Sequence, residues 1–173
     1  TFASKNVGTG LAVTVTGLTL SGGSAGNYTL TQPAGLTGNI TPKALTVNGI
    51  TVTDHLYDGG TSATLTFTGA TLQGTVSGDT VTLSTAGYTA TFASKNVGTG
   101  LAVTVTGLGL SGASAGNYTL TQPAGFTGSI IAAIVTPSIS ANDKIYDGSA
   151  AATLSSQTVA PLISGESVTL NVI

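Results

Sequence analysis

Cysteine, methionine, tryptophan and arginine are all missing from the 173 residues, and only 6% of the residues are charged. Without cysteine there is no disulfide framework and no thiol chemistry. Four lysines and six acidic residues (both counted over the whole sequence) give a net charge of −2, which leaves no basic patch of the kind that binds nucleic acid. The composition therefore argues against thiol enzymes and nucleic-acid-binding proteins.

Long apolar runs are missing as well. No run approaches the roughly eighteen apolar residues of a membrane-spanning helix, so we expect no membrane insertion in this segment. The sequence has no methionine to start translation, and its first residues already belong to a repeat. We therefore expect the chain to be a piece of a longer protein whose targeting signal lies elsewhere.

The sequence does contain a forty-residue stretch that occurs twice. Residues 1–40 and 91–130 differ at only four positions. The differences are Thr19 against Gly109, Gly23 against Ala113, Leu36 against Phe126 and Asn39 against Ser129. A spacing of ninety residues is too long for one coil of a solenoid and is typical of a small domain.

Apolar and polar residues alternate along much of the chain, as in half-buried β-strands. In residues 101–108 the apolar Leu101, Val103 and Val105 fall on one face, with threonines on the other. Further predicted strands cover residues 44–47, 50–53, 63–67, 80–83, 88–92 and 118–121, with turn sequences between them. The pattern predicts an all-β fold of tandem Ig-like β-sandwich modules of about 90 residues, rich in Thr and Gly, forming a rod or fibre.

Asn48-Gly49 resembles a two-residue hairpin turn, but the equivalent position in the next unit is Pro137-Ser138. Proline cannot adopt the positive φ that a type I′ turn needs. We therefore predict a break between two strand segments at Asn48-Gly49, and an edge position for Pro137.

Alignment of Tyr57-Asp58-Gly59 with Tyr146-Asp147-Gly148 places the module boundaries. Residues 42–130 form one complete module. Residues 1–41 are the C-terminal half of a preceding module, and residues 131–173 are the N-terminal half of the next one. The junctions are short and apolar, so we expect the modules to meet stiffly.

Each terminal half carries half a core and open strand edges, so neither half should be stable alone. Either the chain is a window on a longer protein, or the halves of neighbouring copies complete each other head to tail. The second arrangement is a contact that does not close, and it builds a filament.

Several motifs occur in a recognisable order. Residues 143–148 read DKIYDG and are followed by Ser164-Gly165-Glu166. Residues 92–100 read FASKNVGTG and are followed by SAGNYTL at residues 114–120. This order resembles the YDG-type repeats of large bacterial surface proteins, over essentially the whole chain.

The resemblance implies a place in filamentous-haemagglutinin-like adhesins and exoproteins of Gram-negative bacteria. There such repeats form long tandem stalks outside the cell, and the family carries no catalytic residues. The chain departs from the pattern at His55-Leu56, where the family and the third unit have a Lys-aliphatic pair, here Lys144-Ile145.

Asp54, Asp58 and Asp79 are the three acidic residues of the complete module and could in principle gather around calcium. Calcium prefers six to eight oxygen ligands, which three carboxylates far apart in sequence do not supply. The favoured interpretation is that Asp58 caps its own turn, with Gly59 supplying a positive φ. We therefore expect no metal and no cofactor.

His55 is the only histidine, the sequence offers no recognisable Ser-His-acid or Cys-His set around it, and we expect no enzyme. We interpret His55 as an exposed turn residue. Lys95 and Asn117 could in principle form an isopeptide cross-link, but a lysine in a Gly-flanked turn is usually solvated.

Tyr118 is predicted to pack its ring in the core while its hydroxyl caps a loop carbonyl. The repeated Thr-x-Thr triplets are predicted to form the solvent faces of strands. With Tyr57, Asp58 and Gly59 and their equivalents Tyr146, Asp147 and Gly148, Tyr118 is a candidate structural residue rather than a catalytic one.

We expect a structural stalk or fibre repeat of a large secreted bacterial adhesin or extracellular matrix protein, as in a biofilm. Its partners are then neighbouring repeats or copies of itself. The alternative is a β-sandwich module that binds carbohydrate or a host surface, with host or matrix glycans as partners.

Overall fold

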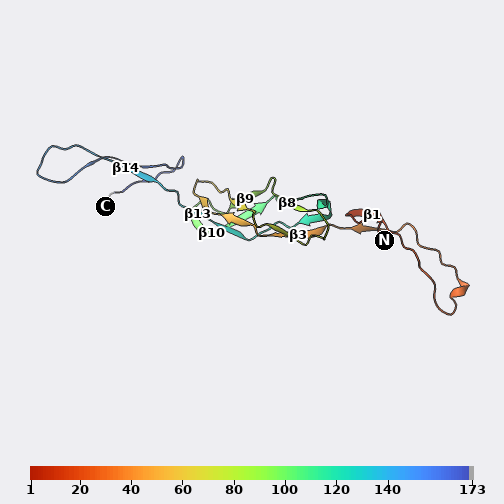
Figure 1. Ribbon diagram of the computed structural model, residues 1–173. Coiled ribbons are helices and arrows are strands. Elements are labelled where there is room, and N and C mark those ends of the chain that lie inside the picture. The colour runs from red at the N-terminus through yellow and green to blue at the C-terminus, as the bar shows by residue number, and fades with distance from the viewer. Residues whose placement is uncertain (172–173) are drawn as a thin grey trace. The chain divides into compact units, whose positions relative to one another are not determined.

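The computed structural model describes residues 1–171, which form short β-strands and two short 3-10 turns but no α-helix (Figure 1). The prediction of an all-β fold is confirmed. None of the described residues forms a helix with the length and hydropathy of a membrane span. The chain divides into two compact units, each of which takes residues from several parts of the sequence.

Unit 1 comprises residues 1–50, 67–89 and 105–124. Its central strand is β3 (Lys43–Asn48), which lies parallel to β12 (Tyr118–Leu120) and antiparallel to β7 (Thr71–Gln73). A second pair joins β8 (Thr82–Ser84) to β11 (Gly109–Ser111). Its buried apolar residues are Leu45, Val47, Ile50, Val105, Leu108 and Tyr118.

Unit 2 comprises residues 51–66, 90–104 and 125–171 of the described chain. Its largest sheet has the order β5–β13–β10–β9. These strands are β5 (His55–Leu56), β13 (Phe126–Ile131), β10 (Gly98–Thr106) and β9 (Thr89–Phe92). A separate pair joins β4 (Thr51–Thr53) to β6 (Thr64–Thr66). The buried apolar residues are Leu65, Ala90, Phe92, Val103 and Ile130.

The predicted break at Asn48-Gly49 is confirmed. β3 ends at Asn48 and β4 begins at Thr51, and the two strands belong to different sheets. Gly49 has a φ of +83°, and a Cβ at this position would lie 2.0 Å from the carbonyl oxygen of Gly69. Glycine is therefore required here for both the backbone conformation and the close approach.

In the following half-module, β14 (Thr136–Ala141) pairs antiparallel with β15 (Leu154–Ala160) in a two-stranded sheet. Pro137 lies opposite Val159 and therefore occupies an edge strand, as predicted. Here the strand continues through the position that is a break in the complete module.

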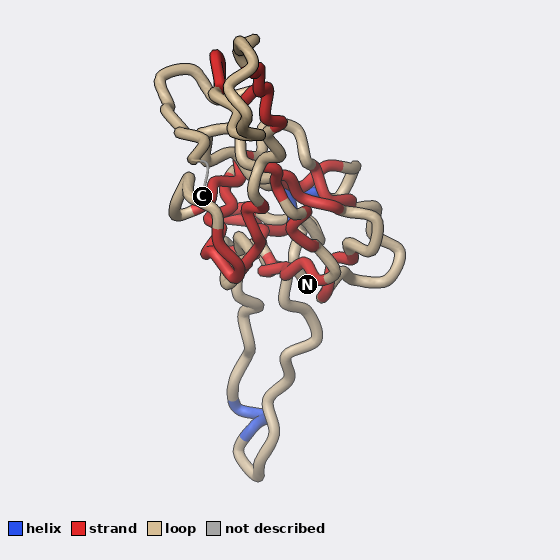
Figure 2. Tube along the Cα trace, turned by 90° about the vertical axis from the view of Figure 1, so that its left-hand side faces the viewer, coloured by secondary structure: helices blue, strands red, loops and turns tan. Residues whose placement is uncertain are grey.

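Residues 1–40 repeat part of the local structure of residues 91–130. β1 (Gly8–Ala12) pairs with β2 (Thr37–Ile40), and the pairing of Gly8 with Ile40 matches that of Gly98 with Ile130. The 3-10 turns η1 (Ala25–Asn27) and η2 (Ala115–Asn117) also match. Figure 2 shows η1 in the long loop that joins β1 to β2.

One strand of the unit 2 sheet is absent from the strands predicted from the sequence. β13 occupies Phe126–Ile131 and lies between β5 and β10 in that sheet. The pairing partners β10 and β5 hold this glycine-containing segment in extended form, overriding its weak intrinsic strand preference.

Candidate interface between modules

Under the predicted module boundaries, a terminal half-module meets the complete module in two places. The first joint lies within unit 1 and joins residues 5–7 of the predicted preceding half-module to residues 76–79 and 117–118. The second joint lies within unit 2 and joins residues 56–57 to residues 161–168 of the predicted following half-module.

An asparagine side chain spans the first joint. Asn117 ends the 3-10 turn η2, and its Oδ1 accepts a hydrogen bond of 2.9 Å from the backbone N–H of Val7. Its Nδ2 donates to Oδ1 of Asn6 at 3.1 Å. Because the amide side chain serves as both acceptor and donor, it fixes the orientation of the residue 4–7 turn against the complete module.

Tyr118 stands beside it at the start of β12, with only 7% of its surface exposed. Its hydroxyl donates to Oδ2 of Asp79 at 2.5 Å and accepts a hydrogen bond of 3.0 Å from the backbone N–H of Val76. The hydrogen bond to the Asp79 carboxylate raises the pKa of Tyr118 above its usual range. The predicted packing of the ring is confirmed, but the predicted carbonyl partner is wrong, because the hydroxyl donates to a carboxylate.

A groove of about 300 Å³ follows these contacts. Residues of the preceding half-module and of the complete module line it together; they are Lys5, Asn6, Val7, Ile40, Thr41, Val76, Ser77, Asp79, Asn117 and Tyr118. Both apolar and polar side chains therefore line the first joint.

The second joint uses a different tyrosine. The hydroxyl of Tyr57 donates to Oε1 of Glu166 in the following half-module. This hydrogen bond raises the pKa of Tyr57 above its usual range. The backbone N–H of Tyr57 also donates to the carbonyl of Ile131 at 2.9 Å, which continues the parallel pairing of β5 with β13.

The surroundings of the second joint are mainly apolar. A groove of about 520 Å³ is lined by Leu56, Tyr57, Val97, Ala132, Ala133, Ile134, Val135, Pro161, Leu162, Ile163, Glu166 and Val168. Gly59 lies close by with a φ of +79°, and a Cβ there would lie 3.1 Å from Cγ2 of Ile163. Glycine at this position thus allows the positive φ of the turn and also leaves room for Ile163 of the next half-module.

The aspartate of this motif caps its own turn, as predicted. Oδ1 of Asp58 accepts a hydrogen bond of 2.8 Å from the backbone N–H of Gly60. This hydrogen bond is the main cause that lowers the pKa of Asp58, and His55 adds to the effect. In the following half-module, Asp147 accepts a bond of 2.9 Å from the N–H of Ser149.

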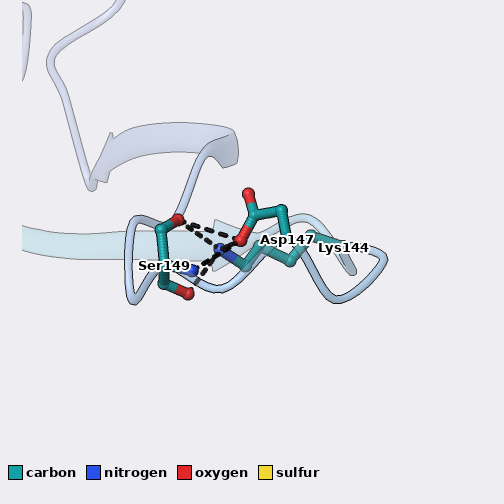
Figure 3. A network of polar contacts seen from close by, with 3 residues as sticks. All are labelled: Lys144, Asp147 and Ser149. Carbon is teal, nitrogen blue, oxygen red and sulfur yellow. Dashed lines mark hydrogen bonds and ion pairs between the residues drawn. The ribbon is translucent and has the colours of Figure 1, made fainter.

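Lys144 binds Oδ1 of Asp147 at 2.8 Å and also reaches Ser149 (Figure 3). The hydrogen bond from Lys144 is the largest cause of the lowered pKa of the Asp147 carboxyl group. His55 takes the place of Lys144 in the complete module, and its Nε2 lies 3.1 Å from Oδ1 of Asp58. The departure at His55-Leu56 therefore keeps a basic nitrogen beside the aspartate.

The interpretation of His55 as an exposed turn residue is wrong. His55 forms part of the short strand β5, its side chain is only 22% exposed, and its ring lies 6.1 Å from that of Phe92. Its spacing of three residues from Asp58, matched by Lys144 and Asp147, was the sequence signal for this pairing.

The other candidate residues are placed as follows. Within residues 1–171, no three acidic or histidine side chains gather in a group that could hold a metal. Asp54 is exposed, while Asp58 and Asp79 make the contacts described above. Lys95 is exposed in a turn of unit 2, and the amide of Asn117 in unit 1 is bonded to Asn6 and Val7.

The threonines of the triplets in β4 and β10 are exposed along their strands, as predicted. Thr14, Thr16 and Thr80 are also exposed but lie outside the strands, so for those triplets the prediction of a strand face is wrong.

A comparison with known protein families finds one match. A family model described as the YDG domain matches residues 1–35 and 41–125, which is more than half of the chain. The second matched segment contains both tyrosines of the two joints, Tyr57 and Tyr118. Neither the curated proteins nor the solved structures gave a match.

Proposed function

Because the chain belongs to the YDG domain family, we propose that it is a structural repeat of an extracellular stalk or fibre. In this proposal, Ig-like β-sandwich modules follow one another as a rod in a secreted bacterial adhesin of the filamentous-haemagglutinin-like kind, or in a matrix protein of a biofilm. The observation that carries the proposal is the pairing of opening and closing halves within one module.

The opening half (residues 42–90) and the closing half (residues 91–130) meet through two parallel strand pairs. β3 pairs with β12, and β5 pairs with β13. Leu45 in β3 is fully buried, whereas its equivalent Ile134 in the following half-module is 84% exposed. The following half-module thus presents the face that a closing half covers in the complete module, and burial of such apolar surface favours completion.

The preceding half-module presents the complementary edge. Residues 28–30 correspond to β12 but form no strand, and Tyr28 is 72% exposed where Tyr118 is 7% exposed. The register of β12 on β3 pairs Tyr118 with Lys43 and Leu120 with Leu45. By the same register, residues 28–30 fit residues 132–134 of another module half.

The partner is therefore a neighbouring repeat, either further along a longer chain or in a neighbouring copy. Completion between copies is head to tail and produces an open filament. Completion along one chain produces a stalk. The same strand pairing serves both arrangements.

The experiment compares assembly of the 173-residue chain with that of two variants across a concentration series, by sedimentation and electron microscopy. Ile134→Thr puts a polar side chain at a position that is buried in a complete module. Val135→Thr is the matched control, because the equivalent Thr46 is exposed there. We expect the chain and the control to form filaments and Ile134→Thr to remain small. Equal assembly of both variants would contradict completion by this register.

A carbohydrate- or host-binding role is the alternative, and it requires exposed aromatic residues on the working surface. The strongly exposed tyrosines are Tyr28 and Tyr146, and both belong to half-modules. Their equivalents Tyr118 and Tyr57 form hydrogen bonds at the joints. Completion of the half-modules therefore explains the exposure of Tyr28 and Tyr146 without a glycan ligand. A glycan array with saturable binding to the assembled chain would restore the alternative.

A further inference from the structure

The two joints contain the same acidic turn. Ser77-Gly78-Asp79 and Ser164-Gly165-Glu166 occupy equivalent positions in successive modules. Their glycines have φ values of +89° and +86°. Each acidic residue donates its backbone N–H to the carbonyl three residues before it, at 3.1 and 3.0 Å. The turns therefore share one backbone geometry, and each carries an acidic residue at the same position.

The two carboxylates have different tyrosine partners. Asp79 accepts from Tyr118, a tyrosine of its own module. Glu166 accepts from Tyr57, a tyrosine of the preceding module. The first joint lacks the Tyr-Asp-Gly tyrosine of the preceding module, because residues 1–171 do not include the opening half of that module. The second joint lacks the equivalent of Tyr118, because they do not include the closing half of the following module. Each joint therefore contains one of the two tyrosine contacts.

We propose that in a complete joint one acidic side chain accepts hydrogen bonds from two tyrosines, one from its own module and one from the Tyr-Asp-Gly motif of the preceding module. A carboxylate has two oxygens and about four acceptor positions, and Tyr118 bonds Oδ2 of Asp79, so a second donor can be accepted. Hydrogen bonds to a charged acceptor are stronger than neutral ones. We call this arrangement the two-tyrosine latch.

The latch assigns partners to the two exposed tyrosines. Tyr146, which is 93% exposed, is the equivalent of Tyr57 and bonds Asp79 of the next module in the array. Tyr28 is the equivalent of Tyr118 and bonds Glu166 of its completed module. This inference rests on the proposed function, because the second tyrosine arrives only when a half-module is completed. It gives the hydroxyl of the Tyr-Asp-Gly motif a role at the interface between modules.

The test uses two full chains fused head to tail through Gly-Tyr-Thr-Ala, the sequence of residues 87–90. By the repeat register, this linker lets residues 131–173 of the first copy and residues 1–41 of the second form one module. Tyr146→Phe in the first copy removes only the hydroxyl that would reach Asp79 of the second copy. The same Tyr146→Phe in the second copy is the control, because no module follows it in the tandem to supply an acidic turn.

The readout is a double-mutant cycle by urea unfolding, with Asp79→Asn of the second copy as the other substitution. We expect Tyr146→Phe in the first copy to reduce the ratio of folded to unfolded protein roughly tenfold or more. In the Asp79→Asn background it should cause little further loss, and in the second copy it should cause none.

Three results overturn the latch, and they are distinguishable. An equal loss in both backgrounds shows that Tyr146 acts without Asp79. A tandem in which Tyr146→Phe has no effect shows that its hydroxyl has no partner. A tandem that gains no folded module compared with the single chain means that completion itself fails, and the proposed function fails together with the latch.

Discussion

The two nearly identical stretches, residues 1–40 and 91–130, share one strand pairing and one 3-10 turn but differ in their surroundings and in their other strands. Both pair their strands in the same register and both contain the same 3-10 turn. Only the second copy is covered by an opening half, and only there is the stretch after the 3-10 turn a strand. The local sequence is therefore sufficient for the strand pairing and the 3-10 turn that both copies share. The strand after the 3-10 turn and the buried core form only where the opening half, residues 42–90, packs against the copy.

The largest predicted difference concerns the two equivalent tyrosines. Tyr118→Ala should lower the free energy of unfolding by about 3–5 kcal/mol, because it removes a buried ring and leaves Asp79 without its partner. At concentrations at which the chain does not assemble, Tyr28→Ala should change it by less than about 0.5 kcal/mol, because Tyr28 is exposed in the single chain. Urea denaturation of the two variants measures the difference. Equal losses would show that residues 1–40 are as well covered as the second copy.

The next difference concerns Gly17 and Gly107, which are equivalent and have φ values of +76° and +78°. Alanine at either position strains the backbone by roughly 1–2 kcal/mol. A Cβ at Gly107 would also lie 2.6 Å from the carbonyl oxygen of Gly87, while a Cβ at Gly17 meets no heavy atom within 4 Å. Gly107→Ala should therefore have the larger effect on the denaturation midpoint. A larger effect of Gly17→Ala would contradict the difference in packing.

A smaller effect is expected at the first joint. Asn117→Ala should cost about 1–2 kcal/mol, because the N–H of Val7 and the amide of Asn6 lose their partner. The loss should appear as faster hydrogen exchange in residues 5–8, with little change in the core strands. Asn27→Ala, at the equivalent position of the first copy, is the control. Equal exchange in both variants would show that the amide does not hold the joint.

The smallest effect is local and depends on pH. The pKa of Asp58 is lowered in the folded chain, chiefly by the hydrogen bond from the N–H of Gly60. The ionised carboxylate therefore stabilises the turn at pH values above the usual pKa of aspartate. This stabilisation is lost as the pH falls through the lowered pKa. The same sign holds for Asp147, where Lys144 is the first cause. NMR of the Gly60 and Ser149 amides below about pH 4 should show both hydrogen bonds being lost. Added salt should weaken the Asp147 turn more than the Asp58 turn, because the lysine charge beside Asp147 is screened while Asp58 depends chiefly on a backbone N–H.

Much of the fold could be predicted from the sequence where alternation was regular. The prediction of residues 118–121 agrees with β12 to within one residue, and residues 88–92 correspond to β9. β7 and β13 were not predicted, because their residues include Gly, Ser and Gln and their extended form depends on partners distant in sequence. The Asx turn of Asp58 was predictable, since it is encoded within three residues.

The joints could not be derived in the same way. The pairing of Tyr57 with Glu166 spans 109 residues, and no local pattern indicates which acidic residue a tyrosine will meet. The repeat offered an indirect signal, because two Ser-Gly-acid turns and two Tyr-Asp-Gly motifs occur in constant order. Only the structure shows that these motifs meet across a module boundary.

The parallel pairing of β3 with β12 has a mechanical consequence. β3 lies where the chain enters the module and β12 lies shortly before the chain leaves it. When the two ends of a module are pulled apart, parallel strands at those ends are drawn past each other along their length. Their hydrogen bonds then carry the load together in shear instead of breaking one after another from an end. A stalk made of such modules would resist tension best along the direction in which the chain runs.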